Sequence, residues 1–278
     1  MSLLITGGTG YIGKRLVRQL EKKYSSIYSV GIEELNLLNY TDTLNFLKNN
    51  NITEVIHLGW SMENENKAIY DNIEALINLI RACDLVKIEK FIFASTNNVY
   101  GTSDNSCLFS ENDIPKPDDA NKYGISKYIG EKLINYTLKE KSCIIRIADV
   151  YGPGQTHGNL IKAIVSNVEN KENLKLYGKG KRERDYIYVD DVIRGIEFIY
   201  ENNLTGTYNL GTGVGTNIKK IVDIVLKICQ NMIGFDYIKV EKEDTSKVIL
   251  NIEKLKKLGF YSNITIEEGL KKILRKEG

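Results

Sequence analysis

The chain has 278 residues, of which 42% are hydrophobic and 27% are charged. A chain of this size and composition predicts one large or two small globular domains and excludes intrinsic disorder. Lysine and arginine number 38 and aspartate and glutamate 36, which leaves a net charge of +2. That balance argues against nucleic acid or an anionic membrane as the main partner, because broad electrostatic capture needs an excess of positive charge. No apolar stretch reaches the roughly 18 residues that a membrane-spanning helix needs.

Cysteine and histidine are too few and too scattered to suggest a metal site or a disulfide framework. The four cysteines, Cys83, Cys107, Cys143 and Cys229, form no CxxC pair, and the histidines are His57 and His157. We therefore expect no bound metal and reduced thiols, as in a cytoplasmic protein. An apolar run already begins at Leu3, so no signal peptide is expected.

Residues 1–150 alternate short apolar runs with longer amphipathic stretches, a pattern typical of βαβ units and a parallel sheet. The expected strands are Leu3–Thr6, Ile27–Ile32, Val55–Leu58, Phe91–Ala94 and Cys143–Ile147. The expected helices are Tyr11–Lys23, Thr41–Asn49 with Thr41 or Asp42 as N-cap, Ile69–Cys83 and Lys122–Lys139. Because crossover connections are right-handed, these units predict a doubly wound α/β domain.

The stretch after the second expected strand is short. Glu34–Tyr40 leaves no room for both a full crossover helix and a strand. We expect either a short third strand around Leu35–Leu38 or a loop in place of the helix before it.

After Val150 the composition shifts, and the glycine-proline-glycine segment at 152–154 predicts a break. The expected helices beyond it are Leu160–Glu169, one from Asp190, Ile218–Cys229, Asn251–Leu258 and Ile266–Leu274, and the expected strands are Leu174–Tyr177, Tyr186–Val189 and Thr207–Leu210. We predict a first domain, residues 1–150, and a smaller lobe, residues 151–278, that returns a helix or strand to the first domain.

The segment Thr6–Gly13, TGGTGYIG, follows the first expected strand and opens the first expected helix. Gly7, Gly10 and Gly13 give it a GxxGxxG pattern. A pyrophosphate needs a tight turn, a close backbone approach and the free N–H groups of a helix N-terminus. At the start of the first βαβ unit, the pattern therefore predicts a dinucleotide-binding loop. The alternative is a glycine turn that serves only tight packing.

An acidic residue about 20 positions further along binds the adenosine ribose of NAD in such loops. Glu33 stands 20 positions after Gly13, beside Glu34. Carboxylates there repel the 2′-phosphate of NADP and so favour NAD, although Lys14 and Arg15 could still serve NADP. The alternative is that both glutamates are merely solvated.

Tyr123 and Lys127 form a YxxxK pair, and a spacing of four places both on one face of a helix. A phenol is protonated at neutral pH, but a nearby ammonium favours the phenolate and lowers the pKa of the phenol. The pair therefore predicts a general acid/base for a carbonyl or carbinol oxygen, with Lys127 also able to hold a nicotinamide ribose. In a chain with 17 tyrosines, an ordinary surface pair is the alternative.

Together these motifs resemble the extended short-chain dehydrogenase/reductases, in particular the NAD-dependent epimerase/dehydratase family that acts on nucleotide sugars. The matching segments stand in family order and are TGGTGYIG, Val55–Leu58, Phe91–Gly101 (FIFASTNNVYG), the YxxxK pair, Arg146–Gln155 (RIADVYGPGQ), Arg184–Val192 (RDYIYVDDV) and Asn209–Gly213 (NLGTG). The resemblance implies a Rossmann-like fold, a nucleotide-sugar substrate and bound NAD or NADP. The implied cofactor contacts are Gly7, Gly10, Tyr11, Ile12, Gly13, Glu33, Leu58, Gly59, Tyr123 and Lys127.

In this family a serine or threonine three residues before the valine of the VYG motif hydrogen-bonds the reacting oxygen. Here that residue is Thr96, which joins Tyr123 and Lys127 as the implied catalytic set, with Ser95 as the neighbouring alternative. Family dehydratases carry Asp-Glu directly after this threonine, whereas this chain carries two asparagines. Amides cannot transfer those protons, so the departure disfavours 4,6-dehydration.

The resemblance also implies a substrate half. The implied substrate contacts are Thr96, Asn97, Asp149, Asn159, Leu160, Tyr177 and Arg184. Arg184 matches the arginine that binds the diphosphate. The basic residues around it, Lys179, Lys181 and Arg182, would add positive potential. Asp149 stands where the family has asparagine, and an acid there suits a sugar hydroxyl better than a pyrophosphate.

Two further residues stand beside the expected cofactor. His57 has no evident partner acid and is expected to be structural. Trp60 stands where small residues are common in the family, so we expect it to crowd or shape the sugar pocket.

Two reactions fit these residues. The preferred one is that of a 4-ketoreductase, which transfers hydride once from NAD(P)H to an NDP-4-keto-6-deoxyhexose, with Tyr123 as general acid. The alternative is an NDP-hexose 4-epimerase with tightly bound NAD. The short region after the second strand and the short chain favour the reductase. A third reading is a non-catalytic nucleotide-binding regulator on the same fold, against which the intact Thr96, Tyr123 and Lys127 argue.

The family resemblance further implies a homodimer. In it the helices Ile69–Cys83 and Lys122–Lys139 would pair with their copies in a four-helix bundle. Within the sequence, the mixed apolar faces of these two helices are the support for it. No nucleic acid and no membrane is expected as a partner.

Overall fold

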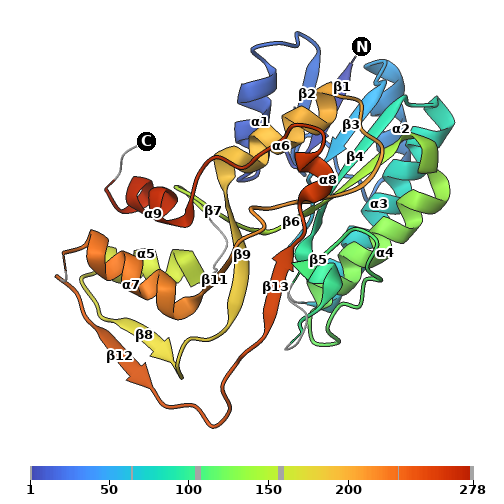
Figure 1. Cartoon of the computed structure of the whole chain (residues 1–278). Helices are drawn as coiled ribbons and strands as arrows, with labels where there is room; N and C mark the ends of the chain where they lie inside the picture. The colour runs from blue at the N-terminus through green and yellow to red at the C-terminus, as the bar shows by residue number, and fades with distance from the viewer. Residues whose placement is uncertain (1, 64, 104–107, 156–159, 231, 276–278) are drawn as a thin grey trace. The chain divides into compact units, whose positions relative to one another are not determined.

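The computed structural model describes residues 2–63, 65–103, 108–155, 160–230 and 232–275 (Figure 1). The chain forms two compact units that interleave along the sequence. Unit 1 comprises Met1–Gly101, Glu111–Ile147 and Ile193–Tyr208, and unit 2 comprises Thr102–Ser110, Ala148–Val192 and Asn209–Gly278. The chain therefore returns to unit 1 twice after leaving it.

A six-stranded sheet forms the centre of unit 1, in the strand order β10-β6-β4-β3-β1-β2. Its strands are β1 (Leu3–Thr6), β2 (Ile27–Val30), β3 (Glu54–His57), β4 (Lys90–Thr96), β6 (Ser142–Ile147) and β10 (Gly206–Leu210). Strands β2, β1, β3, β4 and β6 run parallel to one another. The doubly wound parallel sheet expected from the sequence is therefore confirmed. Strand order reverses between β1 and β3, the switch point at which such sheets bind ligands.

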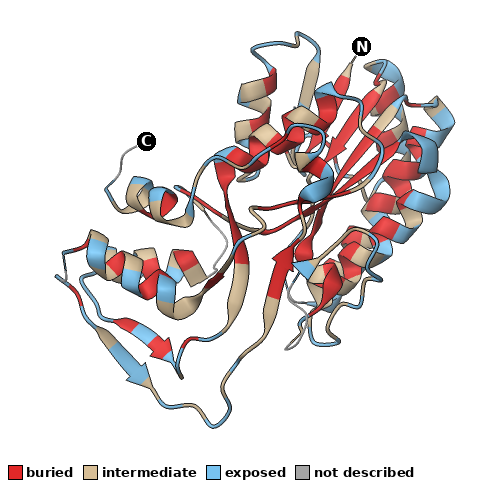
Figure 2. Cartoon of the chain, in the orientation of Figure 1, coloured by how far each residue is buried: buried red, intermediate tan, exposed pale blue. Residues whose placement is uncertain are grey.

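Helices cover both faces of this sheet (Figure 1). On one face lie α2 (Tyr40–Asn49), α3 (Asn66–Val86) and α4 (Lys122–Thr137), which share an apolar core with the strands. On the other face lie α1 (Gly13–Leu20) and α6 (Val189–Glu201). Strands β1 and β3 are buried at every residue, and Figure 2 shows the central strands as a buried layer. This is the burial pattern of a parallel sheet between two helical layers.

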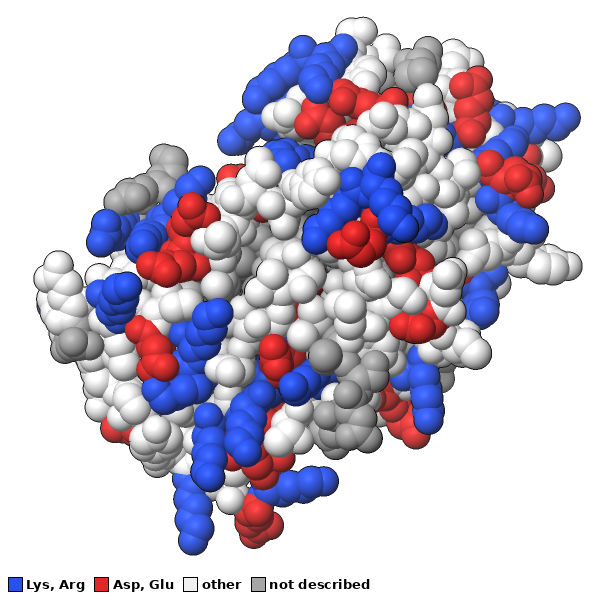
Figure 3. Space-filling view, viewed as in Figure 1, with Lys and Arg blue, Asp and Glu red and all other residues white. Residues whose placement is uncertain are grey.

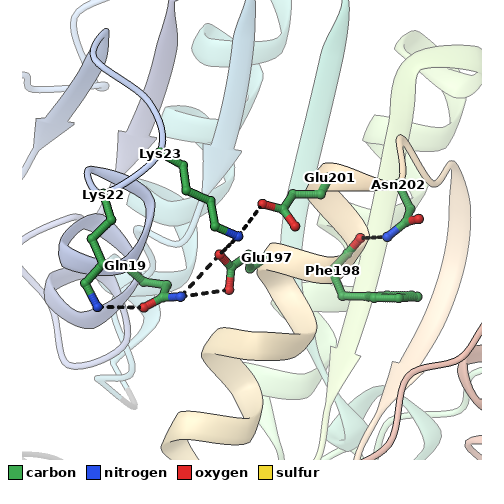
Figure 4. Close-up of polar contacts among 7 residues, drawn as sticks. All are labelled: Gln19, Lys22, Lys23, Glu197, Phe198, Glu201 and Asn202. Atoms are coloured by element: carbon green, nitrogen blue, oxygen red, sulfur yellow. Dashed lines mark hydrogen bonds and ion pairs between the residues drawn. The ribbon is translucent and has the colours of Figure 1, made fainter.

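Polar contacts join α1 to α6 (Figure 4). The Lys23 ammonium, just beyond α1, lies 2.7 Å from a carboxylate oxygen of Glu197 and 2.7 Å from one of Glu201. The Gln19 amide also donates to Glu197, at 3.1 Å. These contacts bind residues from the C-terminal half of the chain to the first helix of unit 1.

Unit 2 contains a five-stranded sheet, ordered β11-β9-β13-β5 with β7 paired to β9, and a two-stranded sheet of β12 and β8. Its strands are β5 (Leu108–Phe109), β7 (Asp149–Tyr151), β8 (Leu174–Tyr177), β9 (Glu183–Tyr188), β11 (Gly215–Asn217), β12 (Phe235–Ile238) and β13 (Lys247–Leu250). Its helices are α5 (Leu160–Glu169), α7 (Ile218–Ile228), α8 (Glu253–Lys256) and α9 (Ile266–Leu274). Strands β5, β7, β11, β12 and β13 were not expected from the sequence.

The structure decides between two alternatives for one segment and shows that one local expectation is wrong. Residues 35–38 form turns and irregular backbone rather than a short strand, so the loop alternative holds. Leu35 still contributes a buried side chain to the core, which explains the apolar pattern. The N-cap of α2 is Asn39, whose side-chain oxygen accepts from the Asp42 N–H at 3.2 Å, and not Thr41 or Asp42.

On the surface shown in Figure 3, Lys and Arg side chains are interspersed with Asp and Glu. Among the described residues, no helix combines the length and apolar character needed to cross a membrane. Within the same residues, no group of three or more His, Cys, Asp or Glu side chains could hold a metal ion.

Candidate active site

The glycine loop lies at the switch point of the unit 1 sheet. Gly7 directly follows β1 and has a φ of +68°, a conformation that residues with side chains rarely adopt. A Cβ on Gly7 would lie 2.6 Å from the backbone nitrogen of Gly59, which follows β3. A Cβ on Gly10 would lie 3.1 Å from the Gly7 carbonyl oxygen, and one on Gly13 would collide with it. The loop thus offers the bare backbone and the helix N-terminus that a pyrophosphate requires, so the residues present fit a dinucleotide.

Tyr11 and Ile12 connect this loop to α1. Ile12 is the N-cap of α1 and makes no side-chain cap, so the first N–H groups of the helix are not capped by a side chain. The Arg15 guanidinium lies 4.5 Å from the centroid of the Tyr11 ring and donates to the Tyr11 carbonyl oxygen at 3.0 Å. Arg15 is therefore engaged within the loop, whereas Lys14 is exposed.

Glu33 and Glu34 follow the end of β2. The Glu34 carboxylate accepts from the N–H of Gly31 at 2.7 Å and so closes its own turn. Glu33 is exposed. Of the two glutamates, Glu33 is therefore the one whose carboxylate is not used in this turn. Leu58 and Gly59, half-buried, follow β3 beside the glycine loop.

Thr96 is the last residue of β4 and caps the 3-10 helix Asn97–Tyr100. Its hydroxyl accepts from the Asn98 backbone N–H at 3.2 Å and donates to the Asn97 side-chain oxygen at 3.2 Å. The neighbouring Ser95 donates instead to Glu131 of α4 at 2.5 Å, inside the core. Ser95 is therefore committed to a structural contact, which leaves Thr96 as the candidate catalytic hydroxyl.

Helix α4 carries Tyr123 and Lys127. Its first turn approaches the 3-10 helix closely, because a Cβ on Gly124 would lie 2.8 Å from the Asn98 carbonyl oxygen. Tyr123 is half-buried, and Lys127 is 2% exposed. The Lys127 ammonium donates to the Ala94 carbonyl oxygen of β4 at 2.6 Å and lies 5.8 Å from the centroid of the Tyr123 ring. The pair therefore lies on one helix face, beside the end of β4.

The protonation of this pair differs from the sequence expectation. Burial raises the pKa of the Tyr123 phenol above its ordinary value, whereas the sequence predicted that Lys127 would lower it. Loss of water around the phenolate is the cause, and the Lys127 ammonium donates its hydrogen bond to the Ala94 carbonyl oxygen. Burial lowers the pKa of Lys127 well below its ordinary value, and the Glu131 carboxylate opposes this effect. Tyr123 is thus a neutral phenol, the proton-donor form of a general acid.

One turn beyond Lys127, α4 carries a buried ion pair that the sequence analysis did not single out. Glu131 lies 2.7 Å from the Arg146 guanidinium of β6, and both side chains are almost fully buried. Arg146 also donates to the Tyr100 hydroxyl at 2.9 Å, and Ser95 completes the network. These contacts join α4 to β4 and β6 and so hold the helix in place. The signal in the sequence was the Tyr-Lys-Glu series at intervals of four.

His57 lies in the core beside this site. Its Nδ1 lies 2.6 Å from the Thr6 hydroxyl, and its ring stacks on Phe93 with 5.8 Å between ring centres. Its Nε2 has no hydrogen-bond partner among the described residues. Burial first, and then the Lys127 charge, lower the pKa of His57 to about 3. The imidazole is therefore neutral at physiological pH.

Arg184 lies half-buried on β9 of unit 2. Its guanidinium donates to the Ser246 carbonyl oxygen at 2.9 Å and to the Ser246 hydroxyl at 3.1 Å. Asp149 of β7 is in register with Tyr186 of β9, and its negative charge acts on Arg184. Burial lowers the pKa of Arg184, and Asp149 opposes this effect. The acid that replaces the family asparagine is thus a counter-charge for the implied diphosphate-binding arginine.

Arg182 adds a second guanidinium to the same cluster. Its Nε is buried and has no hydrogen-bond partner among the described residues. Burial raises the pKa of the neighbouring Tyr186 to about 12, and a hydrogen bond with Arg182 opposes the rise. A buried N–H group without an acceptor costs about 1–3 kcal/mol. An oxyanion would satisfy this donor, so the arginine cluster fits a phosphate-bearing ligand.

Two aspartates of the motif at 184–192 serve the scaffold. Asp185 is fully buried and accepts hydrogen bonds from the N–H groups of Thr212 and Gly213, each at 2.9 Å. Asp191 accepts from the N–H groups of Asn263 and Ile264, each at 2.9 Å. These carboxylates hold the loops after β10 and before α9 in place.

The remaining predicted substrate residues that the structure describes lie on other elements of unit 2. Tyr177 ends β8 and is 60% exposed, and Leu160 is half-buried at the start of α5. Asn159 lies outside the described residues. A hollow of about 540 Å³ also lies in unit 2, and it shares Tyr186 with the arginine cluster. Its walls include Thr216, Lys220 and Glu267, which the sequence analysis did not name.

A single family model spans the glycine loop, Thr96, the YxxxK pair and Arg184. The model of the NAD-dependent epimerase/dehydratase family matches residues 3–211. The chain belongs to the NAD-dependent epimerase/dehydratase family. The family, the Rossmann-type fold and the enzyme class expected from the motifs are confirmed.

Members of this family with several activities are similar to the chain. A dTDP-4-dehydro-6-deoxyglucose reductase from Escherichia coli is 28% identical over 98% of this chain and 96% of its own. The structure of a UDP-glucose 4-epimerase from Thermotoga maritima with UDP-glucose has a TM-score of 0.86 and 26% identity, covering 99% of this chain and 98% of the other. A UDP-glucuronic acid 4-epimerase from Bacillus cereus in complex with NAD has a TM-score of 0.83 and 26% identity, at 99% and 98% coverage.

Proposed function

We propose that the protein is an NAD(P)-dependent oxidoreductase of nucleotide sugars, and specifically a 4-ketoreductase of an NDP-4-keto-6-deoxyhexose. The observation that carries the proposal is Tyr123, a phenol that burial keeps neutral at the end of β4, beside Lys127. A neutral phenol can donate a proton to a carbonyl oxygen as that oxygen gains negative charge. The E. coli relative, a reductase of a 4-keto-6-deoxy sugar nucleotide by name, supports this reaction.

Each residue of the candidate site has a separate role in the proposed reaction. Tyr123 donates the proton to the substrate oxygen, and Lys127 supplies positive charge on the same helix face. Thr96 turns its hydroxyl from Asn97 to the same oxygen. The two asparagines after Thr96 offer no carboxylate, so dehydration of the sugar has no proton carrier there.

NAD is the favoured cofactor, and its reduced form, NADH, would supply the hydride when bound. Gly7, Gly10 and Gly13 give it the bare backbone, and Glu33 offers a carboxylate for the adenosine ribose. The engagement of Arg15 by Tyr11 removes one of the two basic residues expected for NADP. The family and the NAD-bound Bacillus cereus relative support the same choice.

The arginine cluster of unit 2 is proposed to bind the diphosphate. Arg184 and Arg182 supply guanidinium donors, including the orphaned Nε of Arg182. Asp149 keeps Arg184 from being an isolated buried charge, and its carboxylate is proposed to contact a sugar hydroxyl.

A 4-epimerase is the second candidate, and the epimerase structures similar to this chain favour it. An epimerase begins by removing a proton from the sugar hydroxyl, so it needs Tyr123 as phenolate. In that reaction Tyr123 would act first as general base and then as general acid.

The test is to incubate the purified protein with NDP-4-keto-6-deoxyhexoses and with NDP-hexoses, each with and without NADH or NADPH. A reductase consumes reduced cofactor in a one-to-one ratio with the 4-keto sugar nucleotide. An epimerase converts an NDP-hexose to its C4 epimer with no added cofactor and no net consumption. Binding without turnover of any of these compounds would identify the non-catalytic regulator.

A homodimer through α3 and α4 is also proposed. Exposed apolar side chains lie on both helices, with Tyr70 67% exposed on α3 and Ile129 and Tyr136 37% and 92% exposed on α4. Ile129 and Tyr136 are seven residues apart and so share one face of α4. Light scattering on wild-type protein and on Ile129→Glu/Tyr136→Glu should show a dimer and a monomer, and an unchanged mass in the variant would contradict this interface.

A further inference from the structure

The buried Lys127 ammonium is surrounded by two aromatic rings and a backbone carbonyl oxygen. Its ammonium lies 4.3 Å from the centroid of the Trp60 ring and 4.5 Å from that of Phe93. Its hydrogen bond to the Ala94 carbonyl oxygen, at 2.6 Å, completes the surroundings. These three groups come from β4 and from the loop after β3. The sheet and its loop therefore surround the end of a side chain that belongs to α4.

No carboxylate pairs with this ammonium among the described residues. The nearest acid along α4, Glu131, is engaged by Arg146 and Ser95. Burial of an ammonium without a counter-ion is costly, but the face of an aromatic ring carries negative potential and attracts a cation. The ring faces therefore supply part of the electrostatic stabilisation that a carboxylate would give to the ammonium.

Trp60 is itself fixed against α4. Its indole N–H donates to the Ser126 hydroxyl at 3.2 Å, and that hydroxyl donates to the Tyr123 carbonyl oxygen at 2.9 Å. Gly130, four residues beyond Ser126, leaves room for the ring, since a Cβ there would lie 3.3 Å from it. The edge of the indole packs on Phe93 with 5.5 Å between ring centres. The indole thus contacts the helix that carries both predicted catalytic residues of the YxxxK pair.

We propose that Trp60 is a positioning residue whose ring face keeps the Lys127 ammonium charged and in place beside Tyr123. Trp60 was expected to crowd or shape the sugar pocket, and its contacts also place it against α4. The proposal rests on the proposed function in that it takes Lys127 as a working residue of the site. Its first test uses the protein without cofactor or substrate, so it decides about Trp60 even if no nucleotide sugar is turned over.

The titration of Lys127 can be distinguished from that of the other ionisable groups around it. His57 of β3 stays neutral above about pH 4, because its pKa is lowered to about 3. Glu131 of α4 pairs with Arg146 of β6, and Tyr123 titrates above its ordinary range. Phe93 and Ala94 bring no titratable group from β4. Lys127, whose pKa burial lowers, is therefore the titratable group in contact with the Trp60 ring face whose charge the fluorine signal should follow.

Trp60 is the sole tryptophan of the chain, so tryptophan analogues replace this position alone. Protein containing 5-fluoro-, 5,6-difluoro- or 5,6,7-trifluorotryptophan should be titrated by fluorine NMR. Each fluorine withdraws electron density from the ring face with little change in the shape of the ring. The midpoint of the Lys127 titration should therefore fall by about one pH unit across the series. Lys127→Met labelled with 5-fluorotryptophan is the control and should show no titration. A common midpoint across the series, a missing titration in the labelled wild-type chain or a titration that survives Lys127→Met would overturn the proposal.

A second test separates positioning from packing. Trp60→Phe keeps a ring face, whereas Trp60→Leu keeps only apolar bulk. We expect kcat to fall about tenfold in Trp60→Leu and to be partly retained in Trp60→Phe, with KM for the nucleotide sugar unchanged in both. Equal kcat in the two variants would show that the indole only fills space.

Discussion

Unit 1 and unit 2 each hold a partly or fully buried cation at a predicted functional position, but they hold it by different means. Lys127 in unit 1 has a carbonyl oxygen and two aromatic rings around it and no carboxylate partner among the described residues. Arg184 in unit 2 has a serine hydroxyl, two carbonyl oxygens and the charge of Asp149.

The difference matters because a lysine can lose its proton and an arginine cannot. Surroundings without a counter-ion make the charge of Lys127 sensitive to small changes, which suits a group that takes part in proton transfer. Surroundings with a carboxylate and several acceptors fix the guanidinium of Arg184 in direction, which suits recognition of a phosphate. The proposed function thus places proton transfer in unit 1 and binding of the diphosphate in unit 2.

The largest effect expected from this division is on turnover. Tyr123→Phe removes the proton donor and should lower kcat by about 10²- to 10⁴-fold, since general acid catalysis contributes that much. The affinity for NAD, measured by calorimetry on the same protein, should be unchanged. Substantial turnover in the variant would remove Tyr123 from its assigned role.

The next effect concerns the support of α4. Glu131→Gln leaves the Arg146 guanidinium buried without a counter-charge and should lower the free energy of unfolding by about 3–5 kcal/mol. Urea denaturation measures this change. The exposed pair of Lys67 and Asp71 on α3 provides the control, since Asp71→Asn should leave the unfolding curve in place. Equal curves for the two variants would mean that the buried network does not hold the helix.

A smaller effect is expected on substrate affinity. Arg184→Ala should weaken binding of the nucleotide sugar about 10- to 100-fold, as expected for lost hydrogen bonds to a charged group. NAD affinity should not change, and Arg184→Lys should recover part of the loss through charge alone. A parallel loss of NAD affinity would break the assignment of affinity to unit 2.

The smallest effect is a change in the pH dependence of stability. The pKa of His57 is about 3 in the folded protein, below its ordinary value of 6.5, so the unfolded chain binds one more proton between these values. Stability is therefore lost as pH falls from about 6 towards 3, by up to about 1.4 kcal/mol per pH unit from this residue. His57→Asn, which can keep the contact with Thr6, should show a shallower loss in urea denaturation at pH 6.5 and 4.5. Identical slopes would mean that His57 is not buried as neutral imidazole.

The doubly wound half of the molecule could be predicted because its signals are local. Each strand is a short apolar run, and the GxxGxxG and YxxxK motifs need only spacing along the chain. The short strands of unit 2 could not be predicted in this way. Strand β12 is exposed at Asp236 and Tyr237, and β13 finds its partners in β9 and β5, far away in sequence. Such strands are stabilised by pairing with their neighbours, and their own sequences show little hydrophobic pattern.

The residues of the candidate site follow from spacing along the chain and from the family resemblance, but their contacts and charges do not. Tyr123 and Lys127 were expected to couple directly, yet Lys127 is directed at Ala94 and the ring of Trp60. Those partners come from β4 and the loop after β3, so helical spacing could not reveal them. The pKa of Tyr123 follows from burial, a property of the folded chain.

The return of residues 193–208 to unit 1 has a consequence for how the protein is made. Helix α6 supplies Glu197 and Glu201 to α1, and β10 adds the last strand beside β6. During synthesis from the N-terminus, the first 150 residues therefore emerge with one edge of the sheet open and one helical layer incomplete. Unit 1 can close only after residue 208 has left the ribosome, so a fragment that ends near residue 150 should expose apolar surface and aggregate.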